Sequence, residues 1–436
     1  MGPSREWRQV RLGDLIEVKH GWPFKSELMT EELTGSPIVV NIGNFNYTGG
    51  FRFESTTLRE YRGSYPEEYE LQPGSILLVM TCQTAGGEIL GIPARIPSDD
   101  RVYLHNQRLG KVVIREPESV DEGYLYYIFI SQEFNRELFL SATGTKILHT
   151  SPSRIEAFRF YLPPIREQAL ISRVLGCLDD KIDLNRRMNQ TLEAMARAIF
   201  KSWFVDFEPV PGQHPNFFLD SAHERVPSGW VTGEVGDIVE VIDCLHSKKP
   251  ERRSEGRPLL QLANVLDNGL LDMEDTYWIS RDDYELWTSR MEAREGDCVI
   301  TNVGRVGAVA QVPANLKAAL GRNMTGLRCR PTFPFPTFLI ECLRSETMKE
   351  EIRRKTDSGT ILESLNVRNI PKLRLVIPTE PVAREFERVC RPLRARMENN
   401  LEESRTLSAL RDTLLPKLLS GEIRVKQAEK IVEEVV

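Results

Sequence analysis

The chain has 436 residues, of which 41% are hydrophobic and 28% charged, a composition typical of a folded protein with two or more domains. No run of 18 apolar residues occurs and the N-terminus lacks the apolar segment of a signal peptide, so we expect a cytoplasmic protein without a membrane span. The net charge of −6 argues against a protein that holds nucleic acid by bulk charge alone.

Residues 1–161 read as a strand-rich globule. Trp7 precedes Gly13-Asp14, and short β-type runs at 37–42 and 72–78 are flanked by Gly, Asn and Pro. Polar loops with glycines separate the runs. This pattern predicts a mixed α and β unit.

A long helix is expected next, over 162–207. Apolar and amide side chains recur at alternating steps of four and three, which is a heptad pattern. About 40 helical residues would span about 60 Å, and a helix of that length needs a partner for its apolar seam. The seam positions on which we rely are Leu178, Ile182, Asn185 and Leu192.

The second half of the sequence repeats the first. Residues 208–228 are rich in proline and turn formers and are expected to form a linker, followed by a second globule over 229–376 with its own Gly236-Asp237 opening. Gly144 and Gly359 are separated by 215 positions, and so are Asn185 and Asn400. A long internal repeat predicts two similar units related by a pseudo-twofold axis.

A second spacer helix is expected over 377–420, followed by a tail over 421–436 whose last residues we expect to fray. Because the two helices carry polar residues in the middle of their seams, we expect an antiparallel coiled coil in which Asn185 and Asn400 fix the register; the alternative is that both are solvated. Pro392 is expected to kink the second helix or mark its start, and Pro416 to end it. The seam positions are Leu393, Met397, Asn400 and Leu407.

Catalytic motifs were sought without success. The sequence has no P-loop, no GxGxxG, no HExxH and no Asn/Asp-Pro-Pro-aromatic loop. Adjacent carboxylates such as Asp179-Asp180 are expected on solvated faces. The seven cysteines form no CxxC pair, which predicts free thiols and no metal site. We therefore expect a binding protein, not an enzyme.

Two similar units on a helical spacer suit duplex DNA, whose successive turns lie about 34 Å apart. Arg, Lys, Asn, Gln, Ser and Thr read base edges, and Lys and Arg hold phosphates. Asn44 and Asn264 have the alternative of only holding turns, and the basic cluster around Lys248 is at least as well suited to phosphates. The candidate DNA-binding residues are Lys19, His20, Trp22, Lys25, Asn44, Thr81, Gln83, Thr84, Asn106, Gln107, Arg108 and Lys146 in the first globule, and His246, Lys248, Lys249, Arg252, Arg253, Asn264, Thr301, Asn302, Arg305, Arg322 and Asn323 in the second.

Several motifs carry a family resemblance. They are the paired Gly-Asp openings, the leader LPPIREQ at 162–168, the helix exit FKSWFVDF at 200–207 and the end LLPKLLSGEI at 414–423. With them the whole chain resembles the specificity subunit of type I restriction–modification enzymes. The leader of the second helix departs from the pattern, since IPTEPV stands at 377–382, so the two helices need not offer equivalent docking surfaces.

The resemblance implies two target recognition domains, at 1–161 and 229–376, that each read one half of a split asymmetric DNA site. It also implies that the helices set the spacer and dock two methyltransferase subunits, joined by restriction subunits. S-adenosylmethionine, ATP and magnesium would act in those partners, and this chain would hold no cofactor. Two alternatives stay open: a coiled-coil scaffold that binds protein without DNA specificity, and a nuclease with unrecognised carboxylates.

Overall fold

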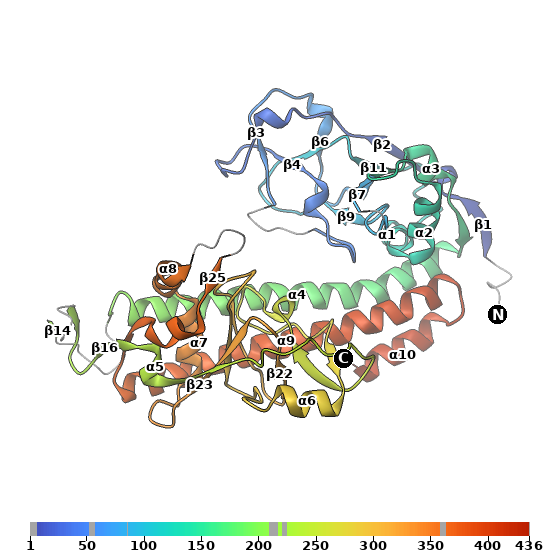
Figure 1. Ribbon diagram of the computed structural model, residues 1–436. Coiled ribbons are helices and arrows are strands. Elements are labelled where there is room, and N and C mark those ends of the chain that lie inside the picture. Colours follow the sequence, from blue (N-terminus) through green and yellow to red (C-terminus); the bar gives the residue numbers. More distant parts are fainter. Residues whose placement is uncertain are drawn as a thin grey trace. The chain divides into compact units, whose positions relative to one another are not determined.

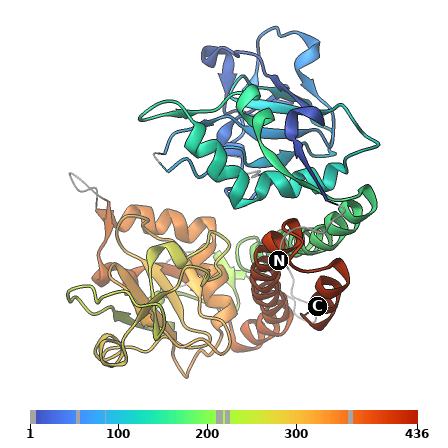
Figure 2. The same cartoon turned by 90° about the vertical axis from the view of Figure 1, so that its right-hand side faces the viewer.

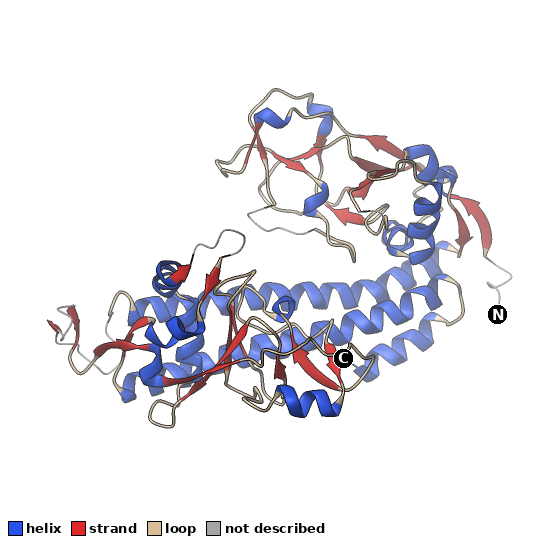
Figure 3. Cartoon of the chain, viewed as in Figure 1, coloured by secondary structure: helices blue, strands red, loops and turns tan. Residues whose placement is uncertain are grey.

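The computed structural model describes residues 7–51, 57–84, 86–208, 217–219, 225–357 and 363–435. The chain divides into two compact units: unit 1 is Met1–Lys181 with Leu407–Val436, and unit 2 is Ile182–Thr406. Each unit combines helices with short strands (Figures 1 and 3). This division places the end of the chain with its beginning, whereas the sequence analysis set 421–436 apart as a tail.

Unit 1 is built on two sheets. The four-stranded sheet has the order β2-β11-β7-β9, all antiparallel, and the five-stranded sheet has the order β3-β5-β4-β10-β6, in which β4 and β10 are parallel. Alternating or continuous apolar runs form these strands, and Leu77 and Leu109 of the four-stranded sheet are fully buried. The strands are β1 (Arg8–Arg11), β2 (Ile16–His20), β3 (Met29–Thr30), β4 (Ile38–Val40), β5 (Glu60–Tyr61), β6 (Glu70–Leu71), β7 (Ile76–Val79), β8 (Thr81–Cys82), β9 (Pro93–Arg95), β10 (Tyr103–His105), β11 (Leu109–Ile114), β12 (Leu148–His149) and β13 (Arg159–Leu162).

Three short helices complete the globular part of unit 1: α1 (Glu122–Ile130), α2 (Gln132–Ser141) and α3 (Pro152–Ala157). Each begins at a side chain that accepts a hydrogen bond from the first turn, Asp121, Ser131 and Ser151 respectively. The segment that connects α2 to α3 contains β12, which pairs with β8.

Unit 2 contains a four-stranded sheet of the same topology, in the order β17-β23-β20-β21, and a second sheet in which β18 and β22 are parallel. A core of aromatic residues from several helices, including Phe200, Phe338 and Phe386, packs beside it. Its elements are β16 (Val231–Glu234), α5 (Val235–Ile238), β17 (Val239–Asp243), β18 (Arg257–Leu260), β19 (Tyr277–Ile279), α6 (Arg281–Trp287), β20 (Cys298–Thr301), β21 (Val309–Gln311), β22 (Ala319–Leu320), β23 (Met324–Cys329), α7 (Pro336–Arg344), α8 (Glu346–Lys355), β24 (Thr356–Asp357), β25 (Ser364–Leu365) and β26 (Arg374–Ile377).

Part of the expected linker is regular. Within 208–228, β14 (Phe217–Leu219) pairs with β15 (Arg225–Pro227) in antiparallel fashion. Residues 209–216 and 220–224 lie outside the described residues.

The Gly-Asp openings occupy the same place in both units. A Cβ at Gly13 would lie 2.9 Å from Cβ of Glu156, and one at Gly236 would lie 3.0 Å from Cβ of Pro371. Only glycine allows the turn before β2 or β17 to approach the segment that precedes the last strand of its globule so closely. The motif is therefore a packing requirement.

The long helix α4 (Ile165–Phe204) begins and ends three residues inside the predicted range. The side chains of the leader at 162–168 contact the globule of unit 1. The Gln168 amide is fully buried and donates to the carbonyls of Ser119 and Pro163 at 3.1 and 2.8 Å. It also accepts from the Asp121 N–H at 2.9 Å. Glu167 accepts a 3.0 Å hydrogen bond from the Trp7 indole. These side chains attach the start of the helix to the globule of unit 1.

The second long helix, α9 (Glu380–Leu419), corrects two expectations. Pro392 neither marks its start nor interrupts it, and Pro416 lies inside it, three residues before its end. A proline removes one backbone hydrogen bond, and the packing of neighbours such as the fully buried Cys390 compensates for that loss. The tail is likewise ordered as a helix, α10 (Val425–Val435), which is joined to α4 by Arg424 with Glu167 and Arg173 with Glu429, at 3.2 and 3.3 Å.

The two long helices contact each other within each unit (Figure 2). In unit 2 the Asn185 amide donates to Glu403 at 2.8 Å and to Ser404 at 3.3 Å, and the Asn400 amide donates to Asn189 at 2.8 Å. As the residue number increases along α4, the number of the bonded residue on α9 decreases, so the helices are antiparallel there. Asn185 and Asn400 are buried and not solvated, and they bond to these neighbours, not to each other.

The remaining predicted seam positions differ in burial. Leu178, Met397 and Leu407 are buried, while Ile182, Leu192 and Leu393 are half-buried. In unit 1 Arg411 of α9 pairs with Asp179 of α4 at 2.7 Å, and the Tyr127 hydroxyl donates to the same carboxylate at 2.7 Å. Asp179 therefore holds α1 and α9 on α4, which corrects the expectation that it is solvated.

Candidate nucleic-acid interface

Four of the predicted residues of the first globule meet in one hollow of about 370 Å³ in unit 1. They come from the segments after β7 and after β10, which are far apart in the sequence. The hollow is lined by Thr81, Gln83, Gln107, Arg108, Ile147 and His149. Long amide and guanidinium side chains that are exposed around a concave surface suit hydrogen bonding to base edges or phosphates.

The loop that carries Gln107 and Arg108 is shaped by a buried neighbour. Asn106 is 7% exposed, and its amide donates to the Asn41 side chain at 2.8 Å while its Oδ1 accepts from the Arg108 N–H at 3.2 Å. The Gln107 N–H donates to the Trp22 carbonyl at 3.0 Å. Because Asn106 is held inside, the two longer side chains after it are exposed.

Buried His105 precedes this loop and must stay neutral. It is 3% exposed and its Nε2 lies 2.9 Å from the Leu109 carbonyl, so the uncharged ring donates there. Burial lowers the pKa of His105 from 6.5 to about 4, and the charges of Lys111 and His20 act in the same direction.

This histidine predicts a pH dependence of stability. The His105 ring takes up a proton below pH 6.5 in the unfolded chain, but only near pH 4 in the folded chain. The contribution of His105 to the free energy of unfolding is therefore highest above pH 6.5 and decreases as the pH falls toward 4. The loss should be on the order of 3 kcal/mol below pH 4, of which about 2 kcal/mol falls between pH 7 and pH 5. Urea denaturation of the wild type, His105→Gln and the control His20→Gln at pH 7 and pH 5 measures it. Equal pH dependence in wild type and His105→Gln would contradict the assignment.

Several other predicted residues of unit 1 have partners that direct them elsewhere. Thr84 donates to Glu88, and buried Asn44 accepts from the Asn41 N–H at 2.7 Å and donates to the Thr57 carbonyl at 3.0 Å. Asn44 thus holds a turn, the alternative left open above. Trp22 packs against Tyr69 with ring centroids 5.3 Å apart. Lys19, His20, Lys25 and Lys146 are exposed.

Unit 2 contains an equivalent asparagine-centred turn, and further predicted residues of this unit are buried. The buried side chain of Asn264 accepts from the Gln261 N–H at 2.7 Å, as Asn44 does from Asn41. Fully buried Thr301 bonds to backbone of its own loop, and Asn302 donates to the Leu365 carbonyl at 3.1 Å. We therefore correct the expectation that Asn44, Asn264, Thr301 and Asn302 contact DNA, because their polar atoms are buried against protein partners.

The basic segment of unit 2 borders a hollow of about 740 Å³ whose lining includes Arg252, Arg253 and Arg281. Its charge is mixed, since Glu251 and Glu255 line the same hollow and Arg252 pairs with Asp275. Lys249 lies 4.1 Å above the Tyr277 ring. Arg305 pairs with Asp267, and His246 with Asp243 at 2.8 Å, while Lys248, Arg322 and Asn323 are exposed.

Two lining residues of the first hollow, Ile147 and His149, were not among the predicted residues, although they lie within three positions of Lys146. Their signal was the pairing of β8 with β12, which places His149 opposite Thr81, with 3.1 Å between His149 Nδ1 and the Thr81 hydroxyl. A two-residue strand leaves too little periodicity to be read from sequence.

Comparison with known proteins supports the resemblance. The model of the type I restriction modification DNA specificity domain matches residues 4–194. The MjaIX specificity subunit of Methanocaldococcus jannaschii is 25% identical over 317 residues, covering 71% of this chain and 71% of that protein. The EcoBI specificity subunit of Escherichia coli is 20% identical over 455 residues, covering 95% of this chain and 89% of that protein.

A crystal structure of a type I restriction–modification S subunit from M. genitalium shares the fold, with a TM-score of 0.57 at 16% identity over 96% of this chain and 99% of that one. The matched domain and the polar hollow define a protein that carries a DNA specificity domain. Over most of its length the chain is similar to specificity subunits of type I restriction–modification enzymes, and residues 4–194 match their DNA specificity domain. Among the described helices, none is long and apolar enough to cross a membrane.

Proposed function

We propose that each globule reads one half of a bipartite, asymmetric DNA site in the major groove. The observation that carries this proposal is the shared topology of β2-β11-β7-β9 and β17-β23-β20-β21, each with a parallel strand pair and an Asn-centred turn beside it. Two similar units in one chain suit two separate half-sites. In unit 1 the readers are Gln83, Gln107 and Arg108.

The long helices act as an antiparallel coiled-coil spacer and as the docking surface for two methyltransferase subunits, joined by restriction subunits. Leu184 and Met195 on α4 are 45% and 46% exposed, which supports docking on this helix. S-adenosylmethionine, ATP and magnesium would act in those partners. The polar layer around Asn185 and Asn400 sets the register of the two helices. Buried polar layers specify register at a cost in stability. That cost fits the two buried amide oxygens in this layer, which lack a hydrogen-bond partner.

Lengthening the spacer tests this proposal. Seven residues inserted after Gln190 and after Glu398 would keep the heptads in register and extend both helices by about 10 Å, about three base pairs of DNA. Selection from random-sequence duplexes, with the methyltransferase subunits bound, should yield the same two half-sites with a longer gap.

Insertion into α4 alone is the control, because the parts of α4 before and after the insertion can no longer both keep their register with α9, which should reduce assembly. An unchanged gap with both insertions would overturn the spacer role. Binding of the partner subunits without enrichment of any DNA sequence would favour the scaffold alternative.

A further inference from the structure

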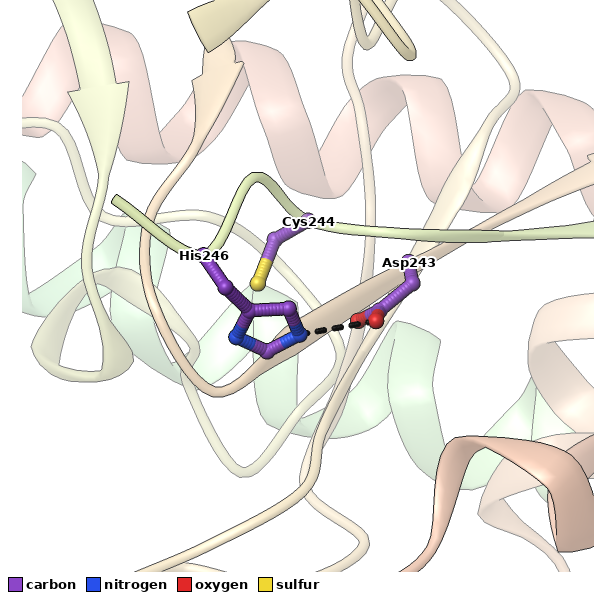
Figure 4. Close-up of side chains that lie close together, drawn as sticks. All are labelled: Asp243, Cys244 and His246. Carbon is purple, nitrogen blue, oxygen red and sulfur yellow. Dashed lines mark hydrogen bonds and ion pairs between the residues drawn. The ribbon is translucent and has the colours of Figure 1, made fainter.

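Three different ligand types converge where β17 ends. A carboxylate oxygen of Asp243, the sulfur of Cys244 and a ring nitrogen of His246 all lie within 4.8 Å of one another. The chain leaves the sheet after Asp243 and turns, so the His246 ring faces back to that carboxylate with the Cys244 sulfur beside it (Figure 4). The His246 Nε2 lies 2.8 Å from Asp243 Oδ2.

The position of the cysteine is set by the neighbouring strand. Cys244 is 2% exposed, and the residue before it, Asp243, pairs with Thr325 of β23. By contrast, the Asp243 and His246 side chains are 28% and 58% exposed. The buried Cys244 sulfur thus lies beside two possible ligands, Asp243 and His246, that solvent can reach.

This ligand set has the chemistry of a zinc site. Zn²⁺ accepts thiolate, imidazole and carboxylate together and keeps water at the fourth position when the protein supplies three ligands, whereas Mg²⁺ and Ca²⁺ require oxygen ligands. Arg290 lies 3.7 Å from Asp243 and opposes a cation, but its guanidinium also donates to the Cys244 carbonyl at 2.9 Å, which holds it to the side of the backbone.

We propose that Asp243, Cys244 and His246 bind one zinc-type divalent transition metal, with water as the fourth ligand. On binding, a metal–sulfur bond forms as the thiol loses its proton to water, and no electron is transferred. The site goes beyond the proposed function and does not depend on it. It fixes the start of the segment that carries Lys248 and Lys249.

The absence of a CxxC pair predicted that the chain has no metal site. The spacing here is Asp-Cys-x-His, and the ligands converge only because the chain bends after β17 (Figure 4). That bend has no sequence signature of its own.

Titration of the full chain with Co²⁺ tests the site. We expect one equivalent to bind with a thiolate-to-cobalt charge-transfer band that Zn²⁺ abolishes. His246→Ala, at an exposed position that the fold does not need, should weaken binding at least about tenfold, and so should Asp243→Asn. Cys177→Ser, which alters an exposed cysteine of α4, is the control and should bind as the wild type does.

Two results would overturn the proposal. One is the absence of the thiolate band at saturating Co²⁺. The other is equal affinity in the wild type and His246→Ala, with circular dichroism showing that both chains are folded.

Discussion

Replacing Arg394 with alanine is expected to lower the free energy of unfolding of unit 2 by about 3–5 kcal/mol. Its guanidinium is 2% exposed and pairs with Glu341, itself 1% exposed, at 2.9 Å. It also donates to the Gln311 side chain and the Gly269 carbonyl, at 3.0 and 2.9 Å. Removing it leaves a buried carboxylate with fewer partners, and the cost of that charge dominates the loss.

The network around Arg394 explains why this effect matters for function. Glu341 on α7 also meets Arg344 at 3.4 Å, and Arg344 pairs with Glu193 on α4. One cluster therefore fixes the globule of unit 2 to segments of both long helices. If the long helices set the spacing of the half-sites, disrupting this cluster should also make the gap between half-sites less uniform in length.

Amide hydrogen exchange in α7 and α9 measures the loss, because it reports local stability without requiring the whole chain to unfold in one step. The matched control is Arg388→Ala on the same helix, whose exposed side chain pairs with half-buried Glu385 and should cost little stability. Equal protection in the two variants would show that the buried cluster does not stabilise the unit.

Replacing Gln107 and Arg108 together with alanine is expected to weaken binding to the selected DNA site by about 1–3 kcal/mol for each side chain that reads a base. Both are exposed on the rim of the hollow in unit 1, on a loop held by buried Asn106, so their removal should leave the fold intact. Half-site specificity should relax only in the half that unit 1 reads.

The salt dependence of the same variant separates base reading from phosphate contact. A base contact changes affinity without altering the slope of affinity against salt, whereas loss of a phosphate contact by Arg108 reduces that slope by about one. Arg136→Ala, an exposed arginine on α2 outside the hollow, is the control. Unchanged affinity and specificity in the double variant would remove this hollow from the recognition surface.

The sequence predicted what depends on local periodicity. The long helices and their central asparagines follow a heptad pattern that extends over tens of residues, and the structure places Asn185 and Asn400 in buried positions. Gln83, Gln107 and Arg108 were predicted as a class from polar loops, and the fold brings them to one hollow. Whether they contact DNA stays a prediction.

Other features depend on tertiary contacts that no local pattern reveals. The sequence around an asparagine that holds a turn, such as Asn44, does not distinguish it from an asparagine that points outward. Thr301 turns inward because it ends the buried strand β20, and Pro392 is tolerated because the packing of α9 outweighs its missing hydrogen bond. The Arg394–Glu341 pair joins residues 53 positions apart, so only the fold shows it.

The most direct test of the central claim is a protection footprint of the chain with its methyltransferase subunits on duplexes selected from random sequence. We predict two protected segments of unrelated sequence, separated by a gap of fixed length whose sequence is free. Alanine at Gln107 and Arg108 should weaken protection of one segment more than the other. Protection of no sequence, or of one continuous segment without a gap, would contradict the reading of a bipartite site by two units.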